Sequence, residues 1–150
     1  MKAMDILTNH ELIGLDTCLW IYHFEDHPIY RQWTKPILQT VSSGQCCAVI
    51  SELSLLEILV QPLRLGLDEV VENYKLSLDN FPNLRLCPVT REVTLEAAAL
   101  RAKYGLRTPD ALIIATSIVQ GASLIVTNDA QWKRVSEIQV VCLNDLSEVE

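Results

Sequence analysis

The chain has 150 residues, of which 49% are hydrophobic and 21% are charged, a composition typical of one soluble globular domain over residues 1–150. It contains no run of eighteen apolar residues and no charged-then-apolar secretory start, so we expect a cytoplasmic protein without a membrane span. The formal net charge of -7 argues against a nucleic-acid binder held by a basic face. A cluster of metal-binding acids would also lower the total, and a bound divalent ion can still attract phosphate.

Short apolar strands alternate with helices along the whole chain. We predict strands at residues 11–15, 46–50, 84–89, 123–127 and 139–143. The predicted helices lie between them, at residues 17–24, 29–41, 51–63, 67–78, 90–104 and 108–119, and Pro36 is expected to strain or split the second. This alternation predicts an α/β fold in which a five-stranded parallel sheet carries helices on both faces.

Two of these helices have clear apolar stripes in the sequence. In helix 51–63 the predicted stripe leaves Glu57 outside it and consists of Leu55, Leu56, Leu59, Val60 and Leu63. In helix 90–104 the stripe consists of Val93, Ala97, Leu100 and Tyr104. We expect these stripes to face the core.

The segment from Arg107 to Trp132 places two acids around one helix and one strand. Thr108 is a suitable N-cap and Pro109 suits the first helical position, which puts Asp110 in the first turn. The helix is apolar nearly all round, and a short turn at Gly121 leads into the strand that ends just before Asp129. A helix of about twelve residues is about 18 Å long, enough to cross the sheet. Its beginning therefore lies near the end of that strand, which makes the two acids neighbours.

Four carboxylates are predicted to meet at one edge of the sheet. Each has a simpler explanation alone, since Asp16 can cap the following helix, Glu57 can form a capping box with Ser54, Asp110 can complement a helix dipole and Asp129 can belong to a turn. In an open parallel sheet, however, ligands bind beyond the carboxyl ends of the strands. Asp16 and Asp129 each follow a strand there, and the two helical acids are brought to the same edge.

Four acids at one edge repel one another and raise one another's pKa unless a cation lies between them. Oxygen ligands without a convincing His or Cys partner favour Mg²⁺ or Mn²⁺ over zinc. Such an ion assists the deprotonation of an attacking water and neutralises charge on a phosphodiester. The four acids therefore predict a hard-cation centre suited to phosphoryl chemistry.

Four short motifs give the chain a resemblance to the PIN-domain ribonucleases, in particular the VapC-type toxins of bacterial toxin–antitoxin pairs. They are L-D-T at residues 15–17, S-L-L-E at 54–57, R-T-P-D-A at 107–111 and T-N-D at 127–129, and their order and spacing fit over nearly the whole chain. The resemblance implies a PIN-like five-stranded parallel sheet, a Mg²⁺ or Mn²⁺ centre held by Asp16, Glu57, Asp110 and Asp129, and hydrolysis of RNA. It also implies a homodimer neutralised by an antitoxin whose tail threads into the active-site groove.

The same resemblance implies supporting roles for three polar residues, Thr17, Thr127 and Asn128, near the metal. The acidic balance of the chain leaves few residues for phosphate contacts, and the candidates that flank the site are Arg107, Lys133 and Arg134. Each of the three can equally be a solvated surface charge. The three histidines have no ligand spacing, and the five cysteines, without a C-x-x-C pair, are expected to be buried reduced thiols.

Other functions share parts of this pattern. An RNA-processing nuclease without an antitoxin would have every motif, and a non-catalytic PIN-like protein-binding module would keep the fold. A phosphatase with a phosphorylated Asp requires a second Asp two residues later, but Cys18 stands there. A response-regulator receiver requires a Lys just after its last strand, where Asn144 and Asp145 stand instead.

Overall fold

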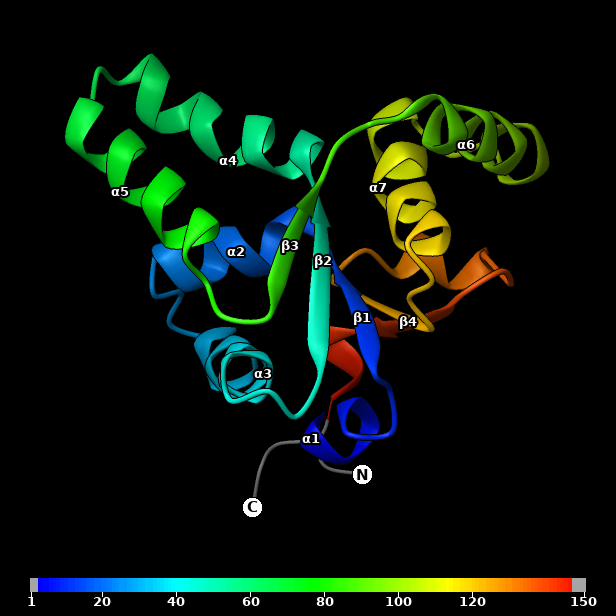
Figure 1. Cartoon of the computed structure of the whole chain (residues 1–150), viewed down its shortest axis with the longest axis horizontal. Coiled ribbons are helices and arrows are strands. Elements are labelled where there is room, and N and C mark those ends of the chain that lie inside the picture. The colour runs from blue at the N-terminus through cyan, green and yellow to red at the C-terminus, as the bar shows by residue number, and fades with distance from the viewer. Residues whose placement is uncertain (1–2, 147–150) are drawn as a thin grey trace.

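A computed structural model of the chain describes residues 3–146. Its centre is a five-stranded parallel sheet in the order β3-β2-β1-β4-β5, which confirms the predicted sheet (Figure 1). The strands are β1 (Leu12–Leu15), β2 (Cys47–Ser51), β3 (Leu84–Cys87), β4 (Leu124–Thr127) and β5 (Gln139–Cys142). The expected domain also included residues 1, 2 and 147–150, which lie outside the described residues.

Helices cover both faces of this sheet (Figure 1). They are α1 (Ala3–Leu7), α2 (Thr17–Phe24), α3 (Arg31–Ser42), α4 (Glu52–Arg64), α5 (Asp68–Asp79), α6 (Arg91–Tyr104) and α7 (Thr108–Val119), with short 3₁₀ helices η1 (Ala130–Arg134) and η2 (Leu143–Asp145). The sequence did not indicate α1, η1 or η2. Pro36 lies inside α3 without splitting it, so that prediction was wrong.

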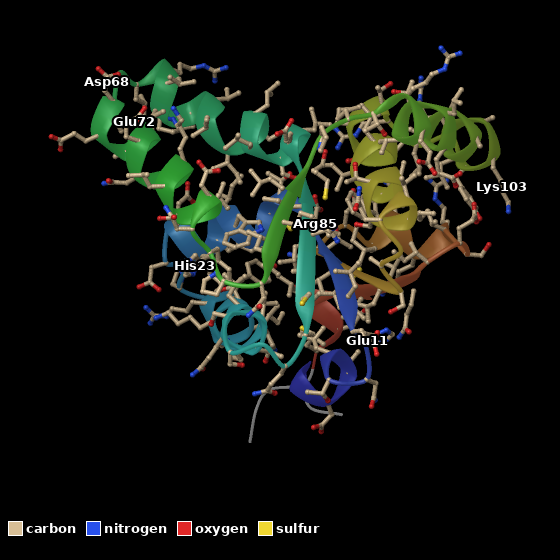
Figure 2. The ribbon with its side chains drawn as sticks, in the orientation of Figure 1. Glu11, His23, Asp68, Glu72, Arg85 and Lys103 are labelled. Atoms are coloured by element: carbon tan, nitrogen blue, oxygen red, sulfur yellow. The ribbon has the colours of Figure 1, made fainter. Side chains whose placement is uncertain are left out.

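Successive residues of the central strands pack against opposite layers, as the pleat of a strand requires. Ile13 and Leu15 contact the core formed with α2 and α3, while Ile125 contacts the core formed with α6 and α7. Charged side chains such as Asp68 and Glu72 on α5 and Lys103 on α6 project away from these layers (Figure 2). Both faces of the sheet are therefore buried, which explains the uninterrupted apolar character of the strands.

Gly14 allows α7 to approach the sheet closely. A Cβ at this position would lie 1.9 Å from the Ser117 hydroxyl oxygen and 2.8 Å from Ser117 Cβ, closer than atoms can pack. Gly14 is two residues before Asp16, and Ser117 is two helical turns after Asp110. This contact consequently sets the distance between β1 and the helix that carries Asp110.

The predicted apolar stripe of α4 was partly wrong. Leu56, Val60 and Leu63 are 57%, 38% and 57% exposed, while the buried positions are Ser54, Ile58 and Pro62. The helix is rotated so that the hydroxyl of Ser54 meets that of Thr17, and residues four apart then define the inner face. In α6 the stripe is as predicted, with Val93, Ala97 and Leu100 buried.

The cysteines are all free, as expected, but they are not all buried. Cys46, Cys87 and Cys142 are buried, Cys18 is half-buried, and Cys47 is exposed. Cys47 is the first residue of β2, where the chain enters the sheet from α3. The expectation of five buried thiols was therefore wrong for Cys18 and Cys47.

Candidate functional site

The carboxyl edge of the sheet, uppermost in Figure 1 between α4 and α7, receives all four candidate acids from different elements. Asp16 follows β1 and caps α2, Glu57 is in the second turn of α4, Asp110 is in the first turn of α7, and Asp129 follows β4 and caps η1. The prediction that the parallel strands and α7 deliver acids to one edge agrees with this placement.

Asp16 is the most buried of the four acids, with 9% exposure. One of its carboxylate oxygens accepts a hydrogen bond from the Thr17 backbone N–H at 2.7 Å, and the other accepts one from the Thr127 hydroxyl at 2.8 Å. Burial raises the pKa of Asp16 to about 6; these two hydrogen bonds lower it, and the charges of Glu57 and Asp110 raise it further. The ionised carboxylate at this position is thus held in place but poorly solvated.

Thr127 joins Asp16 to Asp129. Its fully buried hydroxyl donates to the Asp16 carboxylate and accepts the backbone N–H of Asp129 at 3.1 Å. The Asp129 carboxylate in turn accepts the Gln131 backbone N–H at 2.9 Å, which starts η1. One side chain therefore couples the ends of β1 and β4.

Thr17 orients Glu57. Its hydroxyl oxygen lies 2.7 Å from a Glu57 carboxylate oxygen and 2.8 Å from the Ser54 hydroxyl oxygen. Because a hydroxyl has one proton and an ionised carboxylate only accepts, we assign the Thr17 proton to Glu57 and a Ser54 proton to Thr17. The capping box of Ser54 and Glu57 does not form, since Ser51 caps α4 through the Leu53 backbone N–H.

Asp110 has a cation as its partner. The Arg107 guanidinium Nε donates to an Asp110 carboxylate oxygen at 3.1 Å, and the Asp110 side chain is 15% exposed. Arg107, and not Thr108, occupies the N-cap of α7, so that prediction was wrong by one residue. Asp110 and Asp129 also line one polar cavity of about 290 Å³ with Arg107.

The other predicted residues are engaged around the edge of the site. The Asn128 side chain donates to the Tyr22 hydroxyl at 3.3 Å and accepts the Asn144 backbone N–H at 3.3 Å. Lys133 pairs with Asp145, and Arg134 donates to the Gln131 carbonyl at 3.1 Å. Among Arg107, Lys133 and Arg134, only Arg107 forms an ion pair with a candidate acid within the described chain.

Three contributors to this geometry were missed in the sequence. Ser54 was interpreted as a cap, Tyr22 had no assigned role, and Gly14 was not singled out. Gly14 alone had a usable signal, since a glycine within an apolar strand often marks a close approach of another element. The contact of Ser54 depends on the rotation of α4, which the sequence pattern misjudged, and no inner face was predicted for α2, which carries Tyr22.

The donor set suits a hard divalent cation, because it consists of carboxylate and hydroxyl oxygens. Burial, together with the charges of Glu57 and Asp110, raises the pKa of Asp16, and a bound cation would favour its ionised form. Within residues 3–146, no three His, Cys, Asp or Glu side chains already converge as metal ligands. The acids are instead satisfied by Thr17, Thr127 and Arg107. A bound cation would require small movements of these side chains.

The fold and this edge define a class of protein, an α/β domain with an acidic ligand edge at the carboxyl ends of parallel strands. A protein-family model described as the PIN domain matches residues 13–138. The chain therefore belongs to the PIN domain family, whose members are in general nucleases.

Solved structures support the same fold. VapBC2 from Rickettsia felis, solved bound to a promoter DNA fragment, is similar with 22% identity and a TM-score of 0.64 over 87% of this chain and 98% of that chain. A toxin–antitoxin complex from Klebsiella pneumoniae has 20% identity and a TM-score of 0.68 over 87% and 97%. FitAcB from Neisseria gonorrhoeae has 20% identity and a TM-score of 0.63 over 89% and 99%. A search of curated proteins found no match.

No helix within residues 3–146 combines the length and the apolar character needed to cross a bilayer.

Proposed function

We propose that the chain is a Mg²⁺- or Mn²⁺-dependent endoribonuclease and the toxin of a toxin–antitoxin pair, acting in the cytoplasm as a single PIN-like domain over residues 1–150. The observation that carries the proposal is the placement of acids from four elements at one edge of the sheet, where the charges of Glu57 and Asp110 add to burial in raising the pKa of Asp16. Asp16, Glu57, Asp110 and Asp129 would hold the ion, which supplies activation of a water and neutralisation of phosphate charge.

The residues of the chain have distinct tasks in this proposal. Asp16 is the fixed ligand, because Thr127 and the Thr17 backbone hold both its oxygens. Thr17 fixes the direction of the Glu57 carboxylate through the hydrogen bond of 2.7 Å. Thr127 and Asn128 keep the loop that carries Asp129 against β1 and α2. Phosphate contacts fall to Arg107, Lys133 and Arg134, since they are the cations that flank the edge.

Cleavage by the purified protein tests the catalytic proposal. Wild type should cleave RNA with Mg²⁺ or Mn²⁺ and stop when the ion is chelated, whereas Asp110→Asn should be inactive with an unchanged circular dichroism spectrum. Asp79→Asn, at the exposed end of α5, is the matched control and should remain active. Equal RNA degradation by wild type and Asp110→Asn would identify a contaminant and refute the assignment.

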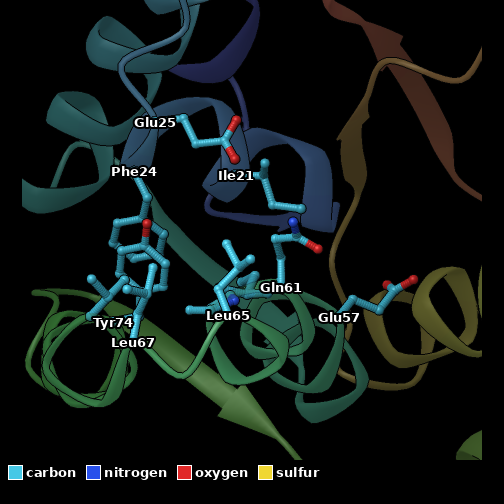
Figure 3. A pocket seen from close by; sticks show the side chains of 11 residues that line it. Ile21, Phe24, Glu25, Glu57, Gln61, Leu65, Leu67 and Tyr74 are labelled. Carbon is cyan, nitrogen blue, oxygen red and sulfur yellow. The ribbon is translucent and has the colours of Figure 1, made fainter.

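A groove between α2, α4 and α5 supports an antitoxin partner. It has a volume of about 180 Å³ and is lined mainly by apolar side chains, including Phe24, Leu65 and Tyr74. Its charged lining residues are Glu25 and Glu57, and Glu57 lies at the end nearest α7 (Figure 3). An apolar antitoxin segment with a basic residue complements such a groove, and its charge would reach the candidate site.

The similar complexes contain antitoxins in the R. felis and K. pneumoniae structures, and this likeness also supports the partner. Co-expression with the small reading frame adjacent to the gene tests it. Wild type should be neutralised and co-purified, whereas Leu65→Glu in the groove should escape. Leu95→Glu, equally exposed on α6, is the control that should still be neutralised. An adjacent region without such a reading frame would favour an RNA-processing nuclease.

We also propose a homodimer, for which α4 offers a surface. Leu56, Val60 and Leu63 form an exposed apolar stripe on one helix, and contiguous exposed apolar surface marks association sites. Light scattering should give twice the chain mass for wild type and the single mass for Leu56→Glu. A monomeric wild type at micromolar concentration would exclude this assembly.

A further inference from the structure

Among the described residues, Arg107 is the cation that pairs with a candidate acid, and helix capping does not account for this arginine. It is the N-cap residue of α7, yet it makes no side-chain capping hydrogen bond, and arginine is not a favoured cap. Its side chain is 79% exposed and extends back to Asp110, whose side chain is 15% exposed. The guanidinium is therefore a solvent-exposed group held by a mostly buried carboxylate.

Several of the acids act on this guanidinium at once. The hydrogen bond and charge of Asp110 raise the pKa of Arg107 most, and the charges of Asp129 and Glu57 raise it further. Arg107 thus experiences three of the four candidate ligands, while Lys133 and Arg134 are bound elsewhere. Arg107 compensates part of the negative charge that would otherwise accumulate at the edge.

From this geometry, and resting on the proposed nuclease function, we infer that Arg107 is an internal counter-ion that Asp110 exchanges for the divalent ion, after which the guanidinium binds the RNA phosphate. Exposed ion pairs are weak, so the exchange costs little. The guanidinium paired with Asp110 Oδ2 neutralises part of the charge that this carboxylate would offer to a divalent ion, and two cations on one carboxylate repel each other. The released guanidinium is planar, and two of its N–H groups can donate hydrogen bonds to two oxygens of one phosphate.

Calorimetric titration of the metal-free protein with Mn²⁺ tests the exchange without requiring activity. Arg107→Ala should bind Mn²⁺ more tightly, by about threefold or more, because a competing pair and a repelling charge are removed. Arg134→Ala removes the same charge without touching an acid and should bind like wild type. Unchanged or weaker Mn²⁺ binding by Arg107→Ala would overturn the inference, as would equal tightening by Arg134→Ala.

Steady-state kinetics then separate the two roles. Arg107→Ala should reach half-maximal activity at a lower Mn²⁺ concentration, yet its KM for RNA should rise about tenfold through loss of a charge-assisted phosphate contact. Arg107→Lys keeps the charge, so its Mn²⁺ affinity should stay near that of wild type while its KM rises. An unchanged KM in both variants would refute the phosphate role. Absence of RNA cleavage by wild type would instead refute the proposed function and leave the calorimetric result standing.

Discussion

The two halves of the acidic edge are built differently. On the β1 and β4 side, Asp16 is buried and both its oxygens are bound by groups of the chain. On the α7 side, Asp110 is held by one exposed arginine. A ligand fixed by buried hydrogen bonds moves little, whereas one in an exposed ion pair adjusts at small cost. The difference suggests a site with one rigid wall and one adjustable wall.

Loss of the Asp16 charge on the rigid side should have the largest effect on RNA cleavage. Asp16→Asn keeps the shape of the side chain but removes the charge, and we expect RNA cleavage to fall at least about 1,000-fold, equivalent to several kcal/mol of transition-state stabilisation. Initial rates at saturating Mn²⁺ measure this. Asp26→Asn, on an exposed turn with its own ion pairs to Arg31 and Lys35, is the control. A loss at Asp16 smaller than at Asp110→Asn, on the adjustable side, would reverse the comparison.

The buried charge of Asp16 should make stability depend on pH. Burial raises its folded pKa to about 6 from the ordinary value of 3.8, so its contribution to stability is greatest at low pH and is lost as pH rises from about 4 to above 6. The expected loss for the metal-free protein is about 3 kcal/mol in the free energy of unfolding. Part of this loss already occurs below pH 4.5, so urea denaturation at pH 4.5 and 7.5 should measure about 2 kcal/mol of it, and Asp16→Asn should show a flatter profile. The pH dependence of Asp16→Asn reports the other titrating groups and is subtracted from that of wild type. A remaining free energy of unfolding that rises between pH 4.5 and 7.5 would contradict the burial argument.

The distance between the two walls depends on Gly14. Gly14→Ala would place a methyl group against Ser117 and push α7 outward, costing about 1 to 3 kcal/mol of stability and reducing Mn²⁺ affinity. Ser117→Gly removes both atoms that obstruct the methyl group, so the double variant should regain Mn²⁺ affinity although a helical glycine still costs stability. Thermal unfolding and Mn²⁺ titration of the three variants distinguish the cases. No recovery in the double variant would show that the contact does not set the spacing.

The smallest effect is expected from removing the Thr127 hydroxyl, which links Asp16 to the backbone of Asp129 on the rigid side. Thr127→Val preserves shape but leaves Asp16 and the Asp129 N–H without their shared partner, and we expect about a tenfold loss in Mn²⁺ affinity. Thr116→Val, a buried threonine of α7 that donates to the Leu112 carbonyl, is the matched control. Equal losses in the two variants would indicate a general packing effect.

Much of the fold could be predicted because local patterns and the rules of parallel sheets agree. The strand ends that carry Asp16 and Asp129 followed from apolar runs, and the place of Asp110 followed from the length of α7. The orientation of α4 could not be predicted, because its leucines suggested one inner face while the contact of Ser54 with Thr17 accompanies another. The spacing of apolar residues indicates which face of a helix is most apolar. It does not reveal a buried hydrogen bond between two hydroxyl groups such as Ser54 and Thr17.

The hydrogen bonds and the ion pair around the acids could not be predicted from the sequence either. In the sequence, Thr127 is an ordinary strand residue. Its role follows from the folded structure, where its hydroxyl lies between the Asp16 carboxylate and the Asp129 backbone N–H. The spacing of three residues allows Arg107 to pair with Asp110, but the sequence could not decide between this pair and a solvated arginine. Such contacts depend on side chains from separate elements, and only the assembled sheet edge brings them together.

The central claim is that the four carboxylates form one divalent-cation centre. A crystal structure of the protein soaked in Mn²⁺, with anomalous data, tests it most directly. We predict an anomalous peak bounded by Asp16, Glu57, Asp110 and Asp129, with the Arg107 guanidinium displaced from Asp110. A saturating soak with no peak there, or with Mn²⁺ bound only elsewhere on the surface, would contradict the account.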